Sequence, residues 1–398
     1  MVVGPRFSDR TNWKLAQNRF TEAVEEVRAS GARILDLTVS NPTRAGLTYD
    51  SAAILGALAS PRALDYDPQA KGLLAAREAV AGYYRDVRGS VANGVDVDPE
   101  RFVLTTSTSE GYSYVFRLLC NAGDELLVPK PSYPLFEFLA DLQDVKLVPY
   151  PLIYDHGWQM DFPSLEKAVT DRTRGVVVVH PNNPTGSYVS PAELKSLNAF
   201  CGAHGLALIV DEVFLDYCLG DEPRASFTEN RGVLTFTLSG VSKIAALPQM
   251  KVAWVVTSGP DSEVAAAMGR LEVIADTYLS MNAPIQWAVP ALLEQRKDIQ
   301  RQLLARVRTN LAELDRQLAA QKACERLSVE GGWYAVLRVP VTRSDEDLAI
   351  ELVRHKQVLV HPGHFYDFPS DGYLVLSLIA VEEEFTEGIG GVLEYLNM

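Results

Sequence analysis

Short apolar runs alternate with longer amphipathic stretches along the middle of the chain. Several of these runs are apolar almost throughout, as expected for strands that are buried on both faces of a mostly parallel sheet. Seven of them lie at residues 102–105, 125–128, 146–150, 175–179, 206–210, 233–238 and 252–256. Because the stretches between them have helical spacing, the pattern predicts an α/β fold: a mostly parallel seven-stranded sheet flanked by helices.

The pattern differs at the two ends of the chain. Residues 12–30 have helical spacing, and residues 34–38 read as a short strand. After residue 284 a long amphipathic stretch, 287–323, exceeds an ordinary helix, and Pro290 allows a bend near its start. Two further strand-like runs and a last helix after Glu382 indicate a smaller α+β domain. We expect residues 46–285 to form the large domain and residues 286–398 the small one, with residues 1–45 belonging to the small domain.

Composition excludes several classes of function. The 398 residues are 47% hydrophobic and 22% charged, the balance of a globular enzyme with about two domains. A net charge of −14 argues against a nucleic-acid partner and an anionic membrane. The four cysteines have no metal-ligand or disulfide spacing, so no metal site is expected. No apolar run approaches a membrane span, and no signal peptide begins the chain, so we expect a cytoplasmic location.

A lysine in a loop of small residues is the first chemical candidate. Lys243 follows Ser239-Gly-Val-Ser242 at the end of an apolar run, and Lys251 follows after a turn that contains a proline. An arbitrary lysine usually lies on the surface. A lysine beside a close backbone approach can instead lose solvent, which lowers its pKa and makes it a nucleophile or base.

Polar motifs follow four other strands, at the edge where ligands of parallel sheets collect. Thr105 to Gly111 opens a helix, as a plain cap or as an anion site; a hydrolase elbow would need a first glycine that is missing. Tyr133 is either a packed aromatic or a ring that stacks on a planar ligand. Two prolines flank the turn that carries Asn183 and hold its amide in place. Asp211 needs a positive or N–H partner, which a structural salt bridge or a protonated pyridine nitrogen could supply.

The Asn183-Pro-Thr-Gly186 turn, Asp211 after an apolar strand and the Ser242-Lys243 loop, in this order, resemble the class I/II aminotransferases. These are pyridoxal-phosphate enzymes of fold type I, the aspartate aminotransferase superfamily. The resemblance extends from Asp36 to the tail at Glu384. It implies pyridoxal 5′-phosphate as cofactor, small amino and keto substrates, and a homodimer with active sites at the subunit interface.

The resemblance also implies a role for each matching residue. Lys243 matches the lysine that forms the aldimine with the cofactor and later moves the proton. Asp211 matches the acid that keeps the pyridine nitrogen protonated, Asn183 the amide bonded to the ring 3′-oxygen, and Tyr133 the stacking ring. The remaining matches concern the phosphate: Ser107, Thr108, Ser109, Ser242 and Lys251 in the same subunit, and Tyr66 from the other subunit.

Three departures from the family concern the cofactor. Lys251 stands where an arginine is usual, which keeps the charge but loses the bidentate fork. Gly240 replaces a hydroxyl residue that contacts the phosphate, and Ser239 is the candidate substitute. Phe214 replaces a tyrosine that helps bond the 3′-oxygen, so either the aldimine pKa rises or Tyr217 compensates.

The fourth departure concerns the substrate. In the tail strand, Val375 stands where the family has the arginine that clamps the α-carboxylate. A substitute cation is the preferred explanation, and its candidates are Arg44, Arg338, His361 and His364. Otherwise, the substrate is not held by an α-carboxylate.

The sequence therefore predicts a pyridoxal-phosphate aminotransferase that transfers an amino group from an amino acid or amine to a keto acid in a ping-pong mechanism. A lyase, racemase, decarboxylase or cyclase on the same scaffold is the alternative, because the reaction depends on which Cα bond is perpendicular to the ring. A non-catalytic binding module is a third hypothesis, against which the retained Lys243, Asp211 and Asn183 argue.

Overall fold

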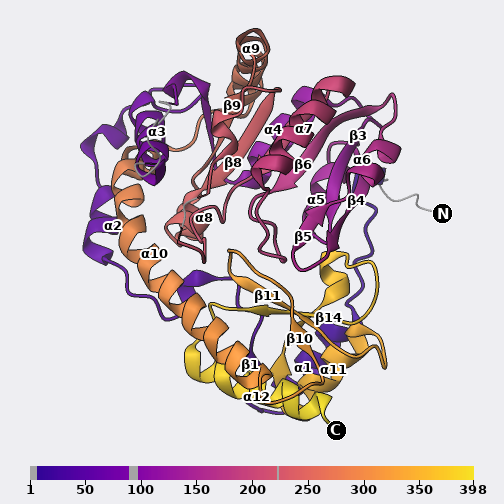
Figure 1. Ribbon diagram of the computed structural model, residues 1–398. Coiled ribbons are helices and arrows are strands. Elements are labelled where there is room, and N and C mark those ends of the chain that lie inside the picture. The colour runs from indigo at the N-terminus through magenta and orange to yellow at the C-terminus, as the bar shows by residue number, and fades with distance from the viewer. Residues whose placement is uncertain (1–6, 89–96, 222–223) are drawn as a thin grey trace, which may run out of the picture.

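The computed structural model describes residues 7–88, 97–221 and 224–398, which form one large sheet and a smaller group of strands joined by a long helix (Figure 1). The large sheet has eight strands. In spatial order they are β2 (Phe102–Thr105), β9 (Ala253–Ser258), β8 (Thr235–Gly240), β7 (Ala207–Asp211), β6 (Thr173–Val179), β3 (Glu125–Lys130), β4 (Lys146–Tyr154) and β5 (Trp158–Met160). The pairs β3–β4, β3–β6, β6–β7 and β7–β8 are parallel, and the other three pairs are antiparallel.

The seven predicted strands are confirmed, but the strand number of seven is wrong because β5 adds an eighth. β4 extends to Tyr154, turns at His156, whose φ is 54°, and returns as the three-residue β5. A strand of three residues is too short for its alternation to stand out in the sequence. The large sheet is therefore mixed at its edges and parallel in its centre.

The central strands are buried on both faces, which explains their continuous apolar runs. In β6, Val177 and Val179 pack on one side of the sheet, and Val176 and Val178 pack on the other. The first face is covered by α4 (Thr108–Leu119), α5 (Phe136–Asp141) and α9 (Asp261–Tyr278). The second face is covered by α6 (Phe162–Ala168) and α7 (Pro191–His204). A third core beside β2 and β9 involves α2 (Ser51–Ala57) and α3 (Leu74–Arg88).

The smaller group combines the N-terminal and C-terminal parts of the chain. Its sheet has the order β10 (Glu325–Arg326), β11 (Tyr334–Arg338), β14 (Tyr373–Ser377) and β13 (His361–Pro362). Beside it β1 (Leu35–Asp36) pairs in parallel with β12 (Val358–Leu359). The helices of this part are α1 (Arg19–Ala29), α11 (Asp345–Lys356) and α12 (Glu382–Leu396). α1 begins later than the predicted residue 12, because Asn18 caps it by accepting a hydrogen bond from the Thr21 N–H. The domain boundaries at residues 45 and 285 stay a prediction.

The two parts are connected by α10 (Ala283–Leu318), which passes from the large sheet to the small one (Figure 1). Its 36 residues correspond to about 54 Å. Pro290 lies in its second turn without ending the helix. Within the described ranges, no helix combines the length and the apolarity needed to cross a bilayer.

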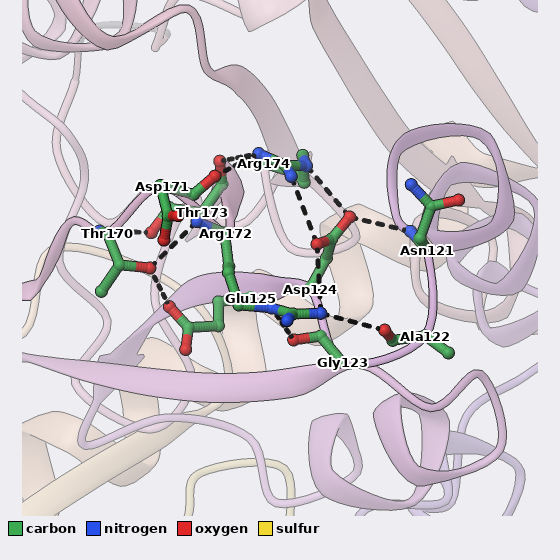
Figure 2. Close-up of polar contacts among 10 residues, drawn as sticks. All are labelled: Asn121, Ala122, Gly123, Asp124, Glu125, Thr170, Asp171, Arg172, Thr173 and Arg174. Atoms are coloured by element: carbon green, nitrogen blue, oxygen red, sulfur yellow. Dashed lines mark hydrogen bonds and ion pairs between the residues drawn. The ribbon is translucent and has the colours of Figure 1, made fainter.

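A buried carboxylate, Asp124, organises the end of the large sheet at which β3 and β6 begin (Figure 2). Asp124 accepts hydrogen bonds from the Asn121 N–H at 2.9 Å and from the Arg174 Nε at 3.0 Å. The hydrogen bond from the Asn121 N–H, and after it the one from Arg174, hold the pKa of Asp124 below its usual range. Arg172 bonds the carbonyls of Ala122 and Gly123 and so fixes the loop before β3. This network is structural, because it lies at the strand ends opposite to those that carry the predicted site.

Asn310 on α10 provides a test of how the small sheet is held. Its buried Nδ2 donates to the carbonyls of Leu378 at 2.9 Å and Ala380 at 2.8 Å, just after β14. Because Asn310→Ala removes the donor of the Leu378 carbonyl, whereas the Ala380 carbonyl keeps Arg306, it should lower the free energy of unfolding by about 1–3 kcal/mol in urea titrations. Arg308→Ala, an exposed change on the same helix, should alter it by less than about 0.5 kcal/mol. Equal effects of the two changes would contradict this account.

Candidate active site

A cavity of about 370 Å³ lies between the large sheet and the small one. It collects side chains from the ends of β6 and β7, from the loop after β8 and from the small sheet. Of the ten predicted site residues, seven line it: Thr108, Ser109, Tyr133, Asn183, Asp211, Ser242 and Lys243. Ser107, Lys251 and Tyr66, which the structure also describes, do not line it. The cavity thus contains the predicted residues with the most specific chemistry.

Lys243 lies on α8 (Val241–Ile244), a single turn that follows β8. Three side chains hold the carbonyls of this turn and the next residues: Tyr217 bonds the Lys243 carbonyl at 2.6 Å, Gln300 the Ile244 carbonyl at 2.9 Å, and Tyr49 the Ala246 carbonyl at 2.9 Å. These donors come from three separate parts of the chain. The backbone that carries the lysine is therefore fixed from several sides.

The amine of Lys243 lies in an aromatic surrounding. Its Nζ is 4.9 Å from the ring centroid of Trp333 and 5.5 Å from that of Phe214. Burial lowers the pKa of Lys243 to about 8, although the charge of Asp211 opposes this shift. A substantial fraction of the neutral amine, the form that acts as a nucleophile or base, is therefore present near neutral pH.

Asp211 ends β7, the strand next to β8, and its side chain is buried. Its carboxylate accepts from the Tyr112 hydroxyl and from the Val213 N–H, both at 3.0 Å. Burial raises the pKa of Asp211 to about 6, despite these two hydrogen bonds and the charge of Lys243. Within the described residues no cation lies within ion-pair distance of it, so the structural salt bridge considered for Asp211 is not present. The carboxylate thus has two neutral hydrogen-bond donors but no cationic partner among the described residues, and a ligand in the cavity would supply one.

Asn183 lies in a turn that hydrogen bonds and close packing make rigid. The Asn182 N–H donates to the Ser187 carbonyl at 2.9 Å, and the Gly186 N–H to the Asn182 carbonyl at 2.7 Å. Gly186 has a φ of +70°, and a Cβ there would lie 2.5 Å from the Gly331 carbonyl oxygen. The buried Oδ1 of Asn183 has no partner among the described residues. An amide without a partner, held at the cavity wall, is available for a ligand.

The N-terminus of α4 forms the third side of the cavity. Ser107 caps this helix, because its Oγ accepts from the Glu110 N–H at 3.2 Å, which explains why its hydroxyl is not at the cavity. The next two residues, Thr108 and Ser109, line the cavity together with Ser242. A helix N-terminus with hydroxyl groups favours an anion. Lys251 is exposed and lies at the end of the turn after α8.

Two of the proposed substitutions are wrong. Ser239 does not line the cavity, and its hydroxyl donates to the Glu212 carbonyl at 3.4 Å. Tyr217 donates its hydroxyl to the Lys243 carbonyl, so it is not available to compensate for Phe214. Sterics explain Gly240, since a Cβ there would lie 2.7 Å from the carbonyl oxygen of Val252, the residue before the paired strand β9.

Among the candidates for a substitute cation, only His361 lines the cavity. Arg338 is paired with Glu325 on the surface, at the edge of the small sheet. Arg44 and His364 are exposed and do not contribute to the lining. Burial lowers the pKa of His361 to about 4, and its Nδ1 lies 3.1 Å from the Tyr366 hydroxyl. His361 is therefore neutral at neutral pH.

Sequence reasoning missed several residues of the site. Tyr112 contacts Asp211, Trp333 contacts the amine of Lys243, and Ser40, Tyr334 and Tyr366 line the cavity. Of these residues, only Tyr112 could have been inferred from the sequence, because it lies one helical turn after Thr108 and so on the same face of the helix. The others come from the N-terminal loop and the small sheet, which no local motif connects to Lys243.

A model of the family "Aminotransferase class I and II" matches residues 32–380. Alanine aminotransferase of Mycobacterium tuberculosis is 30% identical over 364 residues, which cover 88% of this chain and 82% of the relative. Glutamate-pyruvate aminotransferase AlaA of Escherichia coli is 26% identical over 372 residues, or 90% of this chain and 89% of the relative.

The structure is also similar to solved aminotransferases. Alanine aminotransferase from Pyrococcus furiosus superposes with a TM-score of 0.88 at 21% identity, covering 98% of this chain and 100% of the other. This likeness shows the shared fold and confirms the predicted α/β class, with a large sheet flanked by helices and a smaller sheet domain. By its family match over most of its length, the chain belongs to the class I and II aminotransferases, a family of enzymes that use pyridoxal phosphate.

Proposed function

We propose that this chain binds pyridoxal 5′-phosphate in the cavity and transfers an amino group from an amine-bearing donor to a carbonyl acceptor. The observation that carries the proposal is that Asp211, at the end of β7, and Lys243, just after the adjacent strand β8, line the same cavity. Burial disfavours the charge of both groups, as their shifted pKa values record. One ligand with an aldehyde and a basic ring nitrogen would satisfy both, and this is the chemistry of the family's cofactor.

The other lining residues fit the remaining parts of the same molecule. The Nδ2 of Asn183 would donate to the ring 3′-oxygen, and the half-exposed ring of Tyr133 would stack on the pyridine. Thr108, Ser109 and Ser242 would bind the phosphate at the N-terminus of α4. Ser107 would support this site through the helix cap, and Lys251 would act from its edge. The donor set of the cavity thus fits the cofactor.

The proposed mechanism assigns one task to each charged residue. The bound cofactor supplies an electron sink for the bond that is broken at the substrate carbon. Asp211 would keep the ring nitrogen protonated. The Nζ of Lys243 would hold the cofactor in the resting site and, once free, would accept and return the proton of the substrate carbon. Trp333 and Phe214 exclude water from this amine. The alanine and glutamate-pyruvate aminotransferase relatives support transamination and give no support to the lyase, racemase, decarboxylase or cyclase alternative.

We further propose a homodimer in which Tyr66 completes the phosphate site of the partner. The side chain of Tyr66 is 83% exposed. Tyr66 is not among the described residues that line the cavity of its own subunit. Other large apolar side chains are exposed: Leu64 near Tyr66 in the sequence, Val273 and Tyr278 on α9, and Leu279 directly after α9. Residues 68–71 and α9 line one shared cleft, so these segments lie side by side. An exposed apolar surface of this kind is typical of a protein–protein interface.

A half-reaction scan tests the proposed function. Protein loaded with the cofactor is mixed with single amino acids, amines and amino alcohols, and the bound cofactor is then analysed. We expect some donors to convert it to pyridoxamine phosphate with one equivalent of carbonyl product. Lys243→Ala, checked for folding by circular dichroism, should not convert it. Release of ammonia, carbon dioxide or inverted substrate, with the cofactor unchanged, would contradict transamination and favour the alternative.

The lowered pKa of Lys243 predicts an unusual pH dependence in the cofactor-free protein. Only the neutral amine reacts with formaldehyde, so reductive methylation of Lys243 should rise about tenfold per pH unit up to its pKa of about 8 and then level off. Peptide mass spectrometry gives the methylation rate. N-acetyl-lysine amide is the reference, and its rate should keep rising to above about pH 10, because its amine has an ordinary lysine pKa. Coincident profiles of Lys243 and the reference would refute the buried amine.

Interface variants test the dimer. Val273→Asp on α9 places a charge in the exposed apolar surface and should turn a dimer into monomers in light scattering. Val341→Asp is the matched control, because Val341 is 68% exposed against 66% for Val273 but lies in the small-sheet part of the chain. A monomeric wild-type protein, or two variants with the same assembly state, would rule out this interface.

A further inference from the structure

The register of the small sheet brings one face of it to the cavity. Tyr334 and His361 line the cavity from β11 and β13. His361 lies opposite Val375 on β14, and Val375 in turn lies opposite Val336 on β11. Directly opposed residues of an antiparallel pair, and residues two apart on a strand, share a face of the sheet. Val375 and Val336 are therefore on the same face as the two lining residues, and Val375 is fully buried.

This part of the cavity has no fixed positive charge. Among the described lining residues, the only lysine or arginine is Lys243, which lies on the other side with Asp211. His361, the one remaining basic group, is neutral at neutral pH because burial lowers its pKa to about 4. The small-sheet wall consists of aromatic side chains, among them Tyr334, Phe365 and Tyr366, and Leu135 and Phe136 add apolar lining from the start of α5.

A carboxylate bound against this wall would lose its water without gaining a cation. Burying an unpaired carboxylate is strongly unfavourable, whereas a neutral polar group needs only hydrogen bonds. The wall offers such bonds. The Tyr334 hydroxyl has no hydrogen-bond partner among the described residues, and the Tyr366 hydroxyl and His361 form a neutral pair. Ser40 adds a further hydroxyl group.

We propose that the substrates of this site carry an uncharged group, such as a hydroxymethyl or amide group or hydrogen, where an amino acid has its α-carboxylate. The inference rests on the proposed function and narrows its donor class to apolar or aromatic primary amines and amino alcohols. Val375 and the aromatic wall are the residues that determine this specificity.

Matched donors that differ only in the group in question test the proposal. The holoenzyme is offered L-phenylalanine, L-phenylalaninol and 2-phenylethylamine, and kcat/KM of the half-reaction is measured for each. We expect the two neutral donors to exceed L-phenylalanine by about tenfold or more, because the carboxylate has no charged partner. A preference for L-phenylalanine would overturn the proposal, because it would show that some cation binds the substrate carboxylate. Arg44→Gln would then show whether this cation is Arg44 or belongs to the partner subunit.

A variant pair connects the preference to Val375. Val375→Arg places a cation on the cavity-facing side of β14 and should reverse the preference toward L-phenylalanine by about tenfold or more. Val375→Met, a neutral change of similar stem length, should keep the wild-type preference. Unchanged selectivity in a folded Val375→Arg protein would overturn the role of this position. If that variant does not fold, the wild-type donor series decides the proposal.

Calorimetry separates this inference from the proposed function. The holoenzyme is titrated with 3-phenylpropionamide and 3-phenylpropionate, which cannot react as donors. The amide should bind about tenfold tighter or better, and tighter binding of the carboxylate would overturn the inference. If neither class of donor is converted, the proposed function fails, and the amide-to-carboxylate ratio still decides whether the wall rejects charge. If only amino acids are converted, the function stands and the inference fails.

Discussion

The burial of two ionisable groups of opposite charge, at the ends of two adjacent strands, is the constraint on which the rest of this site depends. Asp211 ends β7, and Lys243 follows β8, its parallel neighbour. Each group is unfavourable in its surroundings, as the raised pKa of the carboxyl and the lowered pKa of the amine record. Such a pair is stable only if the scaffold holds both groups firmly, and a ligand that satisfies both is bound in one orientation.

The scaffold around Lys243 meets this requirement through contacts that are distant in sequence. Tyr49, Tyr217 and Gln300 bond three carbonyls at and just after α8. They come from the segment before α2, the loop after β7 and the connecting helix α10. The same helix holds the end of β14 through Asn310. α10 thus links the position of the lysine to that of the small sheet. The cofactor side and the substrate side of the cavity are parts of one packed structure.

The two sides of the cavity differ in what sequence could predict about them. The parallel core was predictable because strands such as β6 are buried on both faces and read as continuous apolar runs. Asn183, Asp211 and Lys243 were predictable because each follows such a strand. The helical spacing from Thr108 places Tyr112 on the right face of α4, but its contact with Asp211 also depends on how α4 packs on the sheet, which the local spacing does not give. The opposition of His361 and Val375 depends on strand register, so the uncharged wall became visible only in three dimensions. The errors at Tyr217 and Ser239 have the same origin, since their hydroxyl groups are bonded to backbone carbonyls.

Covalent attachment of the cofactor tests the central claim most directly. The protein is incubated with pyridoxal 5′-phosphate, reduced with borohydride, digested and analysed by mass spectrometry. The account predicts a stable mass gain on the peptide that contains Lys243, assigned to that residue by fragmentation. It also predicts loss of the label when Asp211 and Asn183 are both replaced by alanine. A label on another lysine, such as the nearby Lys251, or no label at all, would contradict the assignment of this cavity as the cofactor site.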